Sequence, residues 1–156
     1  MERRVITFMI CEDSSDKYEG ICQGINWLGN KLNFIPKIKR TACAKACIID
    51  LSENKYKYDF LICDMQMPFN KDERISIDAG IKVLERVRYF CDTQMFTTIC
   101  SSDRASFNLM KKASLDNDFD FIHFGLDFLI DLENYLIEKI KILDSIENIE
   151  LVKDVL

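Results

Sequence analysis

Short apolar runs alternate along the chain with longer stretches that have helical spacing. Five of these runs are too short for helices and are rich in apolar, β-branched or aromatic side chains, so they predict buried strands. They cover residues 5–11, 34–39, 60–63, 95–100 and 119–124. The second run contains Pro36, which cannot donate to a sheet ladder and therefore predicts an edge strand.

Apolar residues at intervals of three and four predict helices between these strands. The first helix begins at Ser14 or Ser15, either of which can cap it, and ends at Gly29 and Asn30. The other helices are expected after Thr41 and over residues 79–90, 104–113 and 126–143. Strands that alternate with helices predict an α/β domain with a parallel sheet covered on both faces.

The end of the chain is expected to form a separate extension. Asp144 and Glu147 have the spacing of a capping box, so a second short helix is predicted to begin there. This divides the chain into one domain over residues 1–143 and a short helical extension over residues 144–156. Apolar residues continue through the extension, so a homodimer is an open alternative to packing on the sheet.

Composition and charge exclude several classes of protein. The 156 residues carry a formal net charge of −5, and no basic stripe suggests nucleic acid as a partner. No run approaches the roughly 18 apolar residues that span a bilayer, and the first residues do not resemble a signal peptide. Seven irregularly spaced cysteines suit a reducing compartment, which predicts a cytoplasmic protein without membrane contact.

Polar side chains follow three of the predicted strands. Glu12 and Asp13 come after the first strand, Asp64 after the third, and Ser101 after the fourth. In doubly wound sheets ligands bind beyond the carboxyl ends of the strands, so we expect the three carboxylates to converge there. All-oxygen ligands favour Mg²⁺ or Mn²⁺. A carboxylate beside such a metal can form an acyl phosphate, with Ser101 as hydroxyl donor.

Four stretches carry a resemblance to a known family: MICEDSSD, LICDMQMP, DAGIKVLERVR and TTICSSD. With them the chain resembles a response-regulator receiver domain of two-component signalling over residues 4–143. The resemblance implies a flavodoxin-like, doubly wound five-stranded parallel sheet of order 2-1-3-4-5. It also implies that Asp64 is phosphorylated, and that Glu12, Asp13, Asp64 and the backbone carbonyl of Gln66 hold the metal.

The sequence departs from the family at the end of the fifth strand. Receivers carry a lysine there that bonds the acceptor carboxylate and the phosphoryl oxygens, whereas this chain reads FIHFG. Counting from Ser101 without gaps places His123 at that position, and a shift by one places Phe124 there. An imidazolium supplies part of the missing charge, so His123 is a candidate site residue. Phe121 corresponds to the family's switch aromatic, which acts together with Ser101.

A second departure lies beside the acceptor motif. Receivers place a helix glycine about four residues after the motif proline, whereas Gly80 stands twelve after Pro68. Residues 69–78 are polar and are predicted to be a loop inserted next to the site, where it shields the site or contacts a partner.

By this resemblance the function is that of a stand-alone receiver. It would take a phosphoryl group onto Asp64 from a histidine kinase or phosphotransfer protein with Mg²⁺, and signal to a downstream protein by direct contact. Its own chemistry would be at most self-catalysed phosphotransfer and autodephosphorylation, with Gln66 and Asp103 flanking the route of water. The alternative is a non-phosphorylated pseudo-receiver that acts as a protein-binding or dimerisation module.

Overall fold

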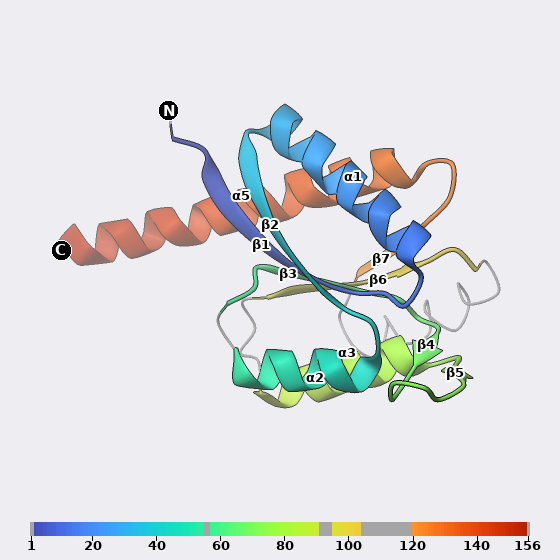
Figure 1. Cartoon of the computed structure of the whole chain (residues 1–156). Coiled ribbons are helices and arrows are strands. Elements are labelled where there is room, and N and C mark those ends of the chain that lie inside the picture. Colours follow the sequence, from blue (N-terminus) through green and yellow to red (C-terminus); the bar gives the residue numbers. More distant parts are fainter. Residues whose placement is uncertain (1, 55–56, 91–94, 104–119, 156) are drawn as a thin grey trace.

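A computed structural model describes residues 2–54, 57–90, 95–103 and 120–155. Its main sheet has five parallel strands in the order β2-β1-β3-β6-β7, which confirms the predicted order (Figure 1). The strands are β1 (Arg4–Cys11), β2 (Phe34–Thr41), β3 (Phe60–Cys63), β6 (Phe96–Ser101) and β7 (Asp120–His123). Strand β2, which contains Pro36, lies at an edge as predicted.

The described helices cover both faces of this sheet (Figure 1). One face carries α1 (Ser15–Leu32) and α5 (Phe128–Val155), and the other carries α2 (Ala44–Glu53) and α3 (Ala79–Phe90). The helix predicted over residues 104–113 lies outside the described residues. The arrangement is a flavodoxin-like, doubly wound fold, as the resemblance to receiver domains implies.

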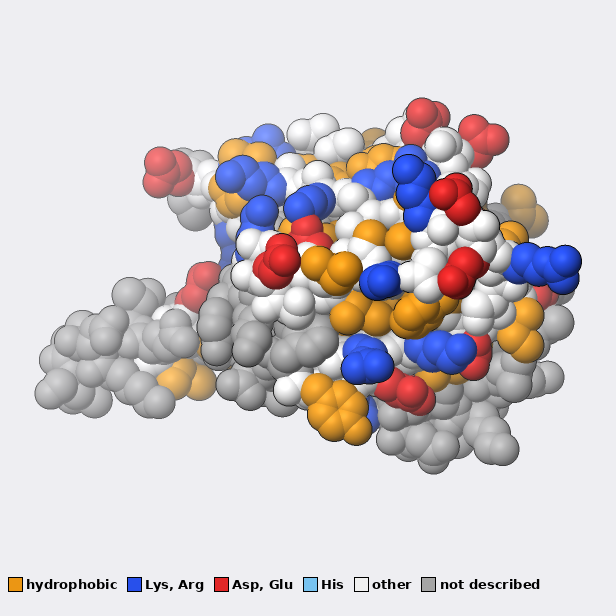
Figure 2. All heavy atoms as spheres, turned by 60° about the horizontal axis from the view of Figure 1, so that its bottom comes forward, with side chains coloured by type: hydrophobic (Ala, Val, Ile, Leu, Met, Phe, Trp, Pro, Cys, Tyr) orange, Lys and Arg blue, Asp and Glu red, His pale blue; other side chains and the backbone are white. Residues whose placement is uncertain are grey.

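The two faces of the sheet bury different side chains. The core beneath α1 and α5 is aromatic, with the rings of Phe8 and Phe60 stacked at 5.1 Å between centroids. The core beneath α2 and α3 is richer in sulfur and includes Cys11, Cys63 and Met65. Figure 2 shows the outer surface on the α2 side, where Lys and Arg are interspersed with Asp and Glu rather than gathered into one basic field.

Helix α1 runs past the predicted stop. Ser14 caps it by accepting from the backbone of Lys17 at 3.4 Å, whereas the end lies at Asn33, whose φ of 63° is left-handed. The prediction of an end at Gly29 and Asn30 was wrong. A β-carbon at position 29 would lie 2.9 Å from the carbonyl oxygen of Phe34, so this glycine allows close packing against β2.

The segment after Pro68 is more ordered than predicted. Within residues 69–78, which were expected to form a loop, Ile75–Ser76 forms the short strand β5. It pairs antiparallel with β4 (Met67–Pro68) to make a small hairpin. Ile75 and Ile77 are largely exposed on it.

Helix α5 continues through the predicted extension without a break. The second helix expected to begin at Asp144 is therefore absent from the described chain. Asp144 and Glu147 do not cap a helix, because both lie inside α5 and accept hydrogen bonds from Arg4 at 2.6 and 2.7 Å. Spacing of three residues suits a capping box and equally suits two acids on one helix face. No described helix combines the length and the apolar character needed to cross a membrane.

Candidate functional site

Two neighbouring strands end in carboxylates at the same edge of the sheet. Strand β1 is followed by Glu12 and Asp13, and β3 is followed by Asp64. The ladder continues past the strands, because the backbone N–H of Asp64 donates to the carbonyl of Cys11 at 2.9 Å. The N–H of Glu12 donates to the carbonyl of Thr41, also at 2.9 Å. Backbone pairing therefore fixes where these side chains begin.

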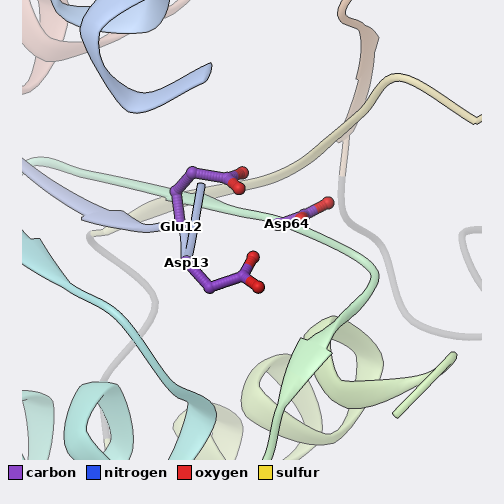
Figure 3. Close-up of side chains that lie close together, drawn as sticks. All are labelled: Glu12, Asp13 and Asp64. Atoms are coloured by element: carbon purple, nitrogen blue, oxygen red, sulfur yellow. The ribbon is translucent and has the colours of Figure 1, made fainter. Parts of the chain in front are cut away.

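The three carboxylates meet as the sequence predicts. One oxygen from each of Glu12, Asp13 and Asp64 lies within 4.8 Å of the others. Figure 3 shows Glu12 and Asp13 projecting from the end of β1 toward the side on which Asp64 lies. Glu12 and Asp64 are buried, with 1% and 8% of their surface exposed, whereas Asp13 is half-buried. Such a cluster is costly unless cations neutralise it.

One cation comes from helix α1. The ammonium nitrogen of Lys17 lies 3.0 Å from Asp64 Oδ1, 3.1 Å from Glu12 Oε2 and 2.8 Å from the carbonyl oxygen of Cys100. Only 10% of the Lys17 side chain is exposed. The site is therefore a buried network in which one lysine joins the ends of β1, β3 and β6.

Burial shifts the ionisation of this network. It raises the pKa of Glu12 to about 7, although the charge of Lys17 acts in the opposite direction. Burial also raises the pKa of Asp64, again against the charge of Lys17. For Lys17, burial disfavours the ammonium, but the carboxylates of Asp64 and Glu12 outweigh it and raise the pKa. Lys17 is thus charged at neutral pH.

The oxygen cluster fits a small divalent cation. Glu12 Oε2 is buried and accepts no hydrogen bond from the described residues, so its lone pairs are available beside the ion pair with Lys17. Carboxylates are the ligands that Mg²⁺ and Mn²⁺ prefer, and both ions usually retain several waters. The half-buried Asp13 leaves room for such waters.

A hollow of about 490 Å³ lies over the acids. Ser101 lines it and accepts a hydrogen bond from the backbone of Asp103 at 3.2 Å, which leaves its own O–H free to donate. Gln66 and Asp103 also line it, and the Gln66 amide donates to Asp103 at 3.1 Å. Ile75 brings the β4–β5 hairpin to its rim.

At the end of β7, His123 was expected to face the acids and supply a cation, but the structure differs. Phe124 lines the hollow, whereas His123 lines a second hollow together with Asp131 and Tyr135 of α5. Consecutive residues at the end of a strand point to opposite sides, so only one of the two can face the acids. The structure thus places His123 away from the cluster. Phe121 packs, partly buried, against the core beneath α2 and α3.

Lys17 is the residue that the sequence reasoning missed. The apolar stripe of α1 contains Ile21, Ile25 and Leu28, and Lys17 lies one turn before Ile21 on the same buried face. A lysine that continues an apolar stripe toward a cluster of strand-end acids was the available signal. It was overlooked because the cation was sought only at the end of the fifth strand.

The comparisons with known proteins agree on the fold. No protein-family model matches the sequence, and no curated protein matches it. Among solved structures, a response-regulator receiver domain protein from Clostridium thermocellum is 15% identical, with a TM-score of 0.69 over 90% of this chain and 98% of that one. A pilus assembly-related protein from Burkholderia pseudomallei is 13% identical, with a TM-score of 0.60 over 86% and 88% of the two chains.

A third similar structure is the pilus assembly protein CpaE from Caulobacter crescentus. It is 8% identical, with a TM-score of 0.56 over 85% of this chain and 90% of that one. At such low identities these likenesses establish the architecture alone. The chain has the fold of a response-regulator receiver domain.

Proposed function

We propose that the chain is a receiver that accepts a phosphoryl group on Asp64 from a histidine kinase or a phosphotransfer protein. The observation that carries this proposal is the convergence of Glu12, Asp13 and Asp64 at the carboxyl edge of a receiver-fold sheet, with oxygens within 4.8 Å of one another. Mg²⁺ or Mn²⁺ would be the cofactor. The signal would pass to a downstream protein by direct contact.

The chemistry follows from the donor set. A carboxylate oxygen of Asp64 bonds to phosphorus while the P–N bond of the donor phosphohistidine breaks, and the imidazole leaves with the bonding electrons. A divalent cation held by Glu12, Asp13, Asp64 and the Gln66 carbonyl would neutralise the phosphoryl oxygens. The Ser101 hydroxyl would donate to one of these oxygens, and Phe121 would act with it as the switch. Gln66 and Asp103 would flank the water that later hydrolyses the acyl phosphate.

Intact-mass measurement tests the proposal. We expect the wild-type protein to gain the mass of one phosphoryl group after incubation with acetyl phosphate or phosphoramidate and Mg²⁺. Asp64→Asn should gain none, because an amide oxygen is a poor nucleophile. Asp72→Asn is a matched control, since Asp72 lies on the exposed hairpin segment at a φ of 69° that asparagine also tolerates.

The opposite result is equally definite. A wild-type protein that gains no phosphoryl group from either small donor or from a cognate kinase contradicts the proposal. The same holds if Asp64→Asn is phosphorylated as readily as the wild type.

The alternative is a pseudo-receiver that binds proteins or dimerises without being phosphorylated. Two observations favour it: Asp64 is already ion-paired with Lys17, and α5 exposes Ile130, Ile142 and Ile149. Under this alternative, phosphorylation fails while light scattering reports a dimer that Ile142→Ser weakens. A monomer that is phosphorylated contradicts it.

A further inference from the structure

The cation of this site comes from a helix, while the end of β7 presents an aromatic ring. We propose that Lys17 is the catalytic residue that binds the phosphoryl oxygens on Asp64, in place of a lysine at the end of the fifth strand. The inference rests on the proposed function of Asp64 and names a further residue for it.

The position of Lys17 is costly unless the acids use its charge. Its side chain is nine-tenths buried, and the residue stands in the first turn of α1, where the helix dipole disfavours a cation. Packing alone would be better served by an apolar side chain, since Ile21 and Ile25 occupy the same face. The contacts with Asp64 and Glu12 offset that cost, so the charge is tied to the cluster.

The geometry brings this charge to the reacting atoms. Lys17 Nζ lies 3.0 Å from Asp64 Oδ1, so it touches the carboxylate that would bond to phosphorus. When a phosphoryl group joins Asp64, its terminal oxygens are bonded to the phosphorus atom that the linking oxygen holds, so they lie close to that oxygen. An ammonium has three protons and a flexible stem, so Lys17 can keep the Cys100 carbonyl and turn one donor to a phosphoryl oxygen.

Charge balance requires such a donor. A phosphorylated Asp64 together with Glu12 and Asp13, when both are ionised, carries roughly four negative charges, because a phosphoryl group at pH 7 brings about two. One divalent cation neutralises half of them. Lys17 is the only ammonium or guanidinium among the described residues that line the hollow.

Phe124 occupies the side from which a strand lysine would come. Its ring centroid is 5.8 Å from Lys17 Nζ, and its tip lies over α1, 2.9 Å from where a β-carbon on Gly20 would stand. The ring covers the lysine on this side, and the missing side chain of Gly20 makes room for it. Position 124 is thus close enough to the acids for a long side chain placed there to reach them.

The first experiment compares Lys17→Met with the wild type through two measurements that should move in opposite directions. Phosphoryl uptake from acetyl phosphate should fall roughly tenfold to a hundredfold, as expected for the loss of a charged hydrogen bond. Affinity for Mn²⁺ alone, measured by calorimetry, should rise several-fold, because a repelling charge beside three carboxylates has gone. If Lys17 were merely structural, its replacement would lower phosphoryl uptake, Mn²⁺ affinity and thermal stability together.

The second experiment moves the charge. Adding Phe124→Lys to Lys17→Met should raise phosphoryl uptake at least about threefold above that of Lys17→Met, by returning part of a charged hydrogen bond, since position 124 faces the same hollow. Adding His123→Lys instead is the matched control and should restore nothing, because that position lines another hollow. If Phe124→Lys restores uptake and His123→Lys does not, poor folding of Lys17→Met cannot explain the loss of uptake.

Two results separate failure of this inference from failure of the proposed function. If Lys17→Met takes up phosphoryl groups as well as the wild type does, the proposed role of Lys17 is overturned and the proposal for Asp64 stands. Uptake that falls in parallel with Mn²⁺ affinity and thermal stability, without rescue by Phe124→Lys, overturns it too. A wild-type protein that is never phosphorylated overturns both proposals.

Discussion

The hollow over Glu12, Asp13 and Asp64, here called the acid hollow, has two walls that pack differently: the β3 wall at Asp64 and the β7 wall at Phe124. On the β3 wall, Asp64 leaves the end of the strand and Gly80 of α3 packs behind its backbone. On the β7 wall, Phe124 packs against α1 at Gly20, beside Lys17. On the β3 wall the backbone of Gly80 packs against the backbone of Asp64, whereas on the β7 wall the Phe124 ring packs against Gly20 of α1. The closest contact on each wall thus involves a glycine.

This difference determines whether each wall can adjust to an added side chain. Behind Asp64, the backbone of Gly80 donates to the carbonyl of Met65 at 3.1 Å, and the atom closest to an added β-carbon is the main-chain oxygen of Asp64, which cannot rotate aside. Beside Phe124, the closest atom is the far end of a ring that can rotate or shift. A main-chain contact keeps the backbone of Asp64 in one place. A side-chain wall lets the site take its cation from another element.

Replacing the glycine of the β3 wall should have the largest effect. A β-carbon at position 80 would overlap the carbonyl oxygen of Asp64 and lie 2.9 Å from Ile99 Cδ1. We expect Gly80→Ala to lower the free energy of unfolding by about 1–3 kcal/mol, as overpacking of a core does. Urea denaturation measures it. A change below about 0.5 kcal/mol would mean that this wall yields as easily as the other.

The same substitution on the β7 wall should cost much less. Alanine at position 20 gains about 0.5–1 kcal/mol of helix propensity over glycine. It would contact only the tip of the Phe124 ring, at 2.9 Å before any adjustment. We expect Gly20→Ala to change the free energy of unfolding by less than about 1 kcal/mol, by the same denaturation measurement. A loss equal to that of Gly80→Ala would remove the distinction between the walls.

The smallest effect is expected at the neighbour of Phe124. Because His123 lines the hollow shared with α5 rather than the acid hollow, His123→Lys in the wild-type background should leave phosphoryl uptake unchanged within error. Intact mass over a time course measures it. An increase in uptake would place this side chain at the acids and restore the histidine as the candidate cation.

The β3 wall was predictable because its information is local. A short apolar run that ends in an acid defines both a strand and the edge at which that acid lies. The parallel sheet then brings Glu12, Asp13 and Asp64 together by register alone. The alternation of strands and helices predicts a parallel sheet, whereas the strand order came from the resemblance to receiver domains.

The rest of the site depends on packing between distant segments, which the pattern of one segment does not contain. Lys17 reaches Asp64 only because α1 lies across the sheet with its apolar stripe inward, forty-seven positions away in sequence. The neighbouring positions 123 and 124 could not be separated by counting, since a shift of one exchanges their sides. The β4–β5 hairpin went unnoticed because its strands are only two residues long.

Helix α5 is longer than the strands against which it packs, and this has a consequence. At about 1.5 Å per residue, its 28 residues span about 42 Å, whereas the eight residues of β1 span about 26 Å. The helix is therefore longer than the sheet that it packs against, and Figure 1 shows its last turns reaching beyond the strands. Arg4 ties Asp144 and Glu147 to the start of β1 through exposed charges, which salt screens. Higher ionic strength should therefore weaken the link between Arg4 and this part of the helix.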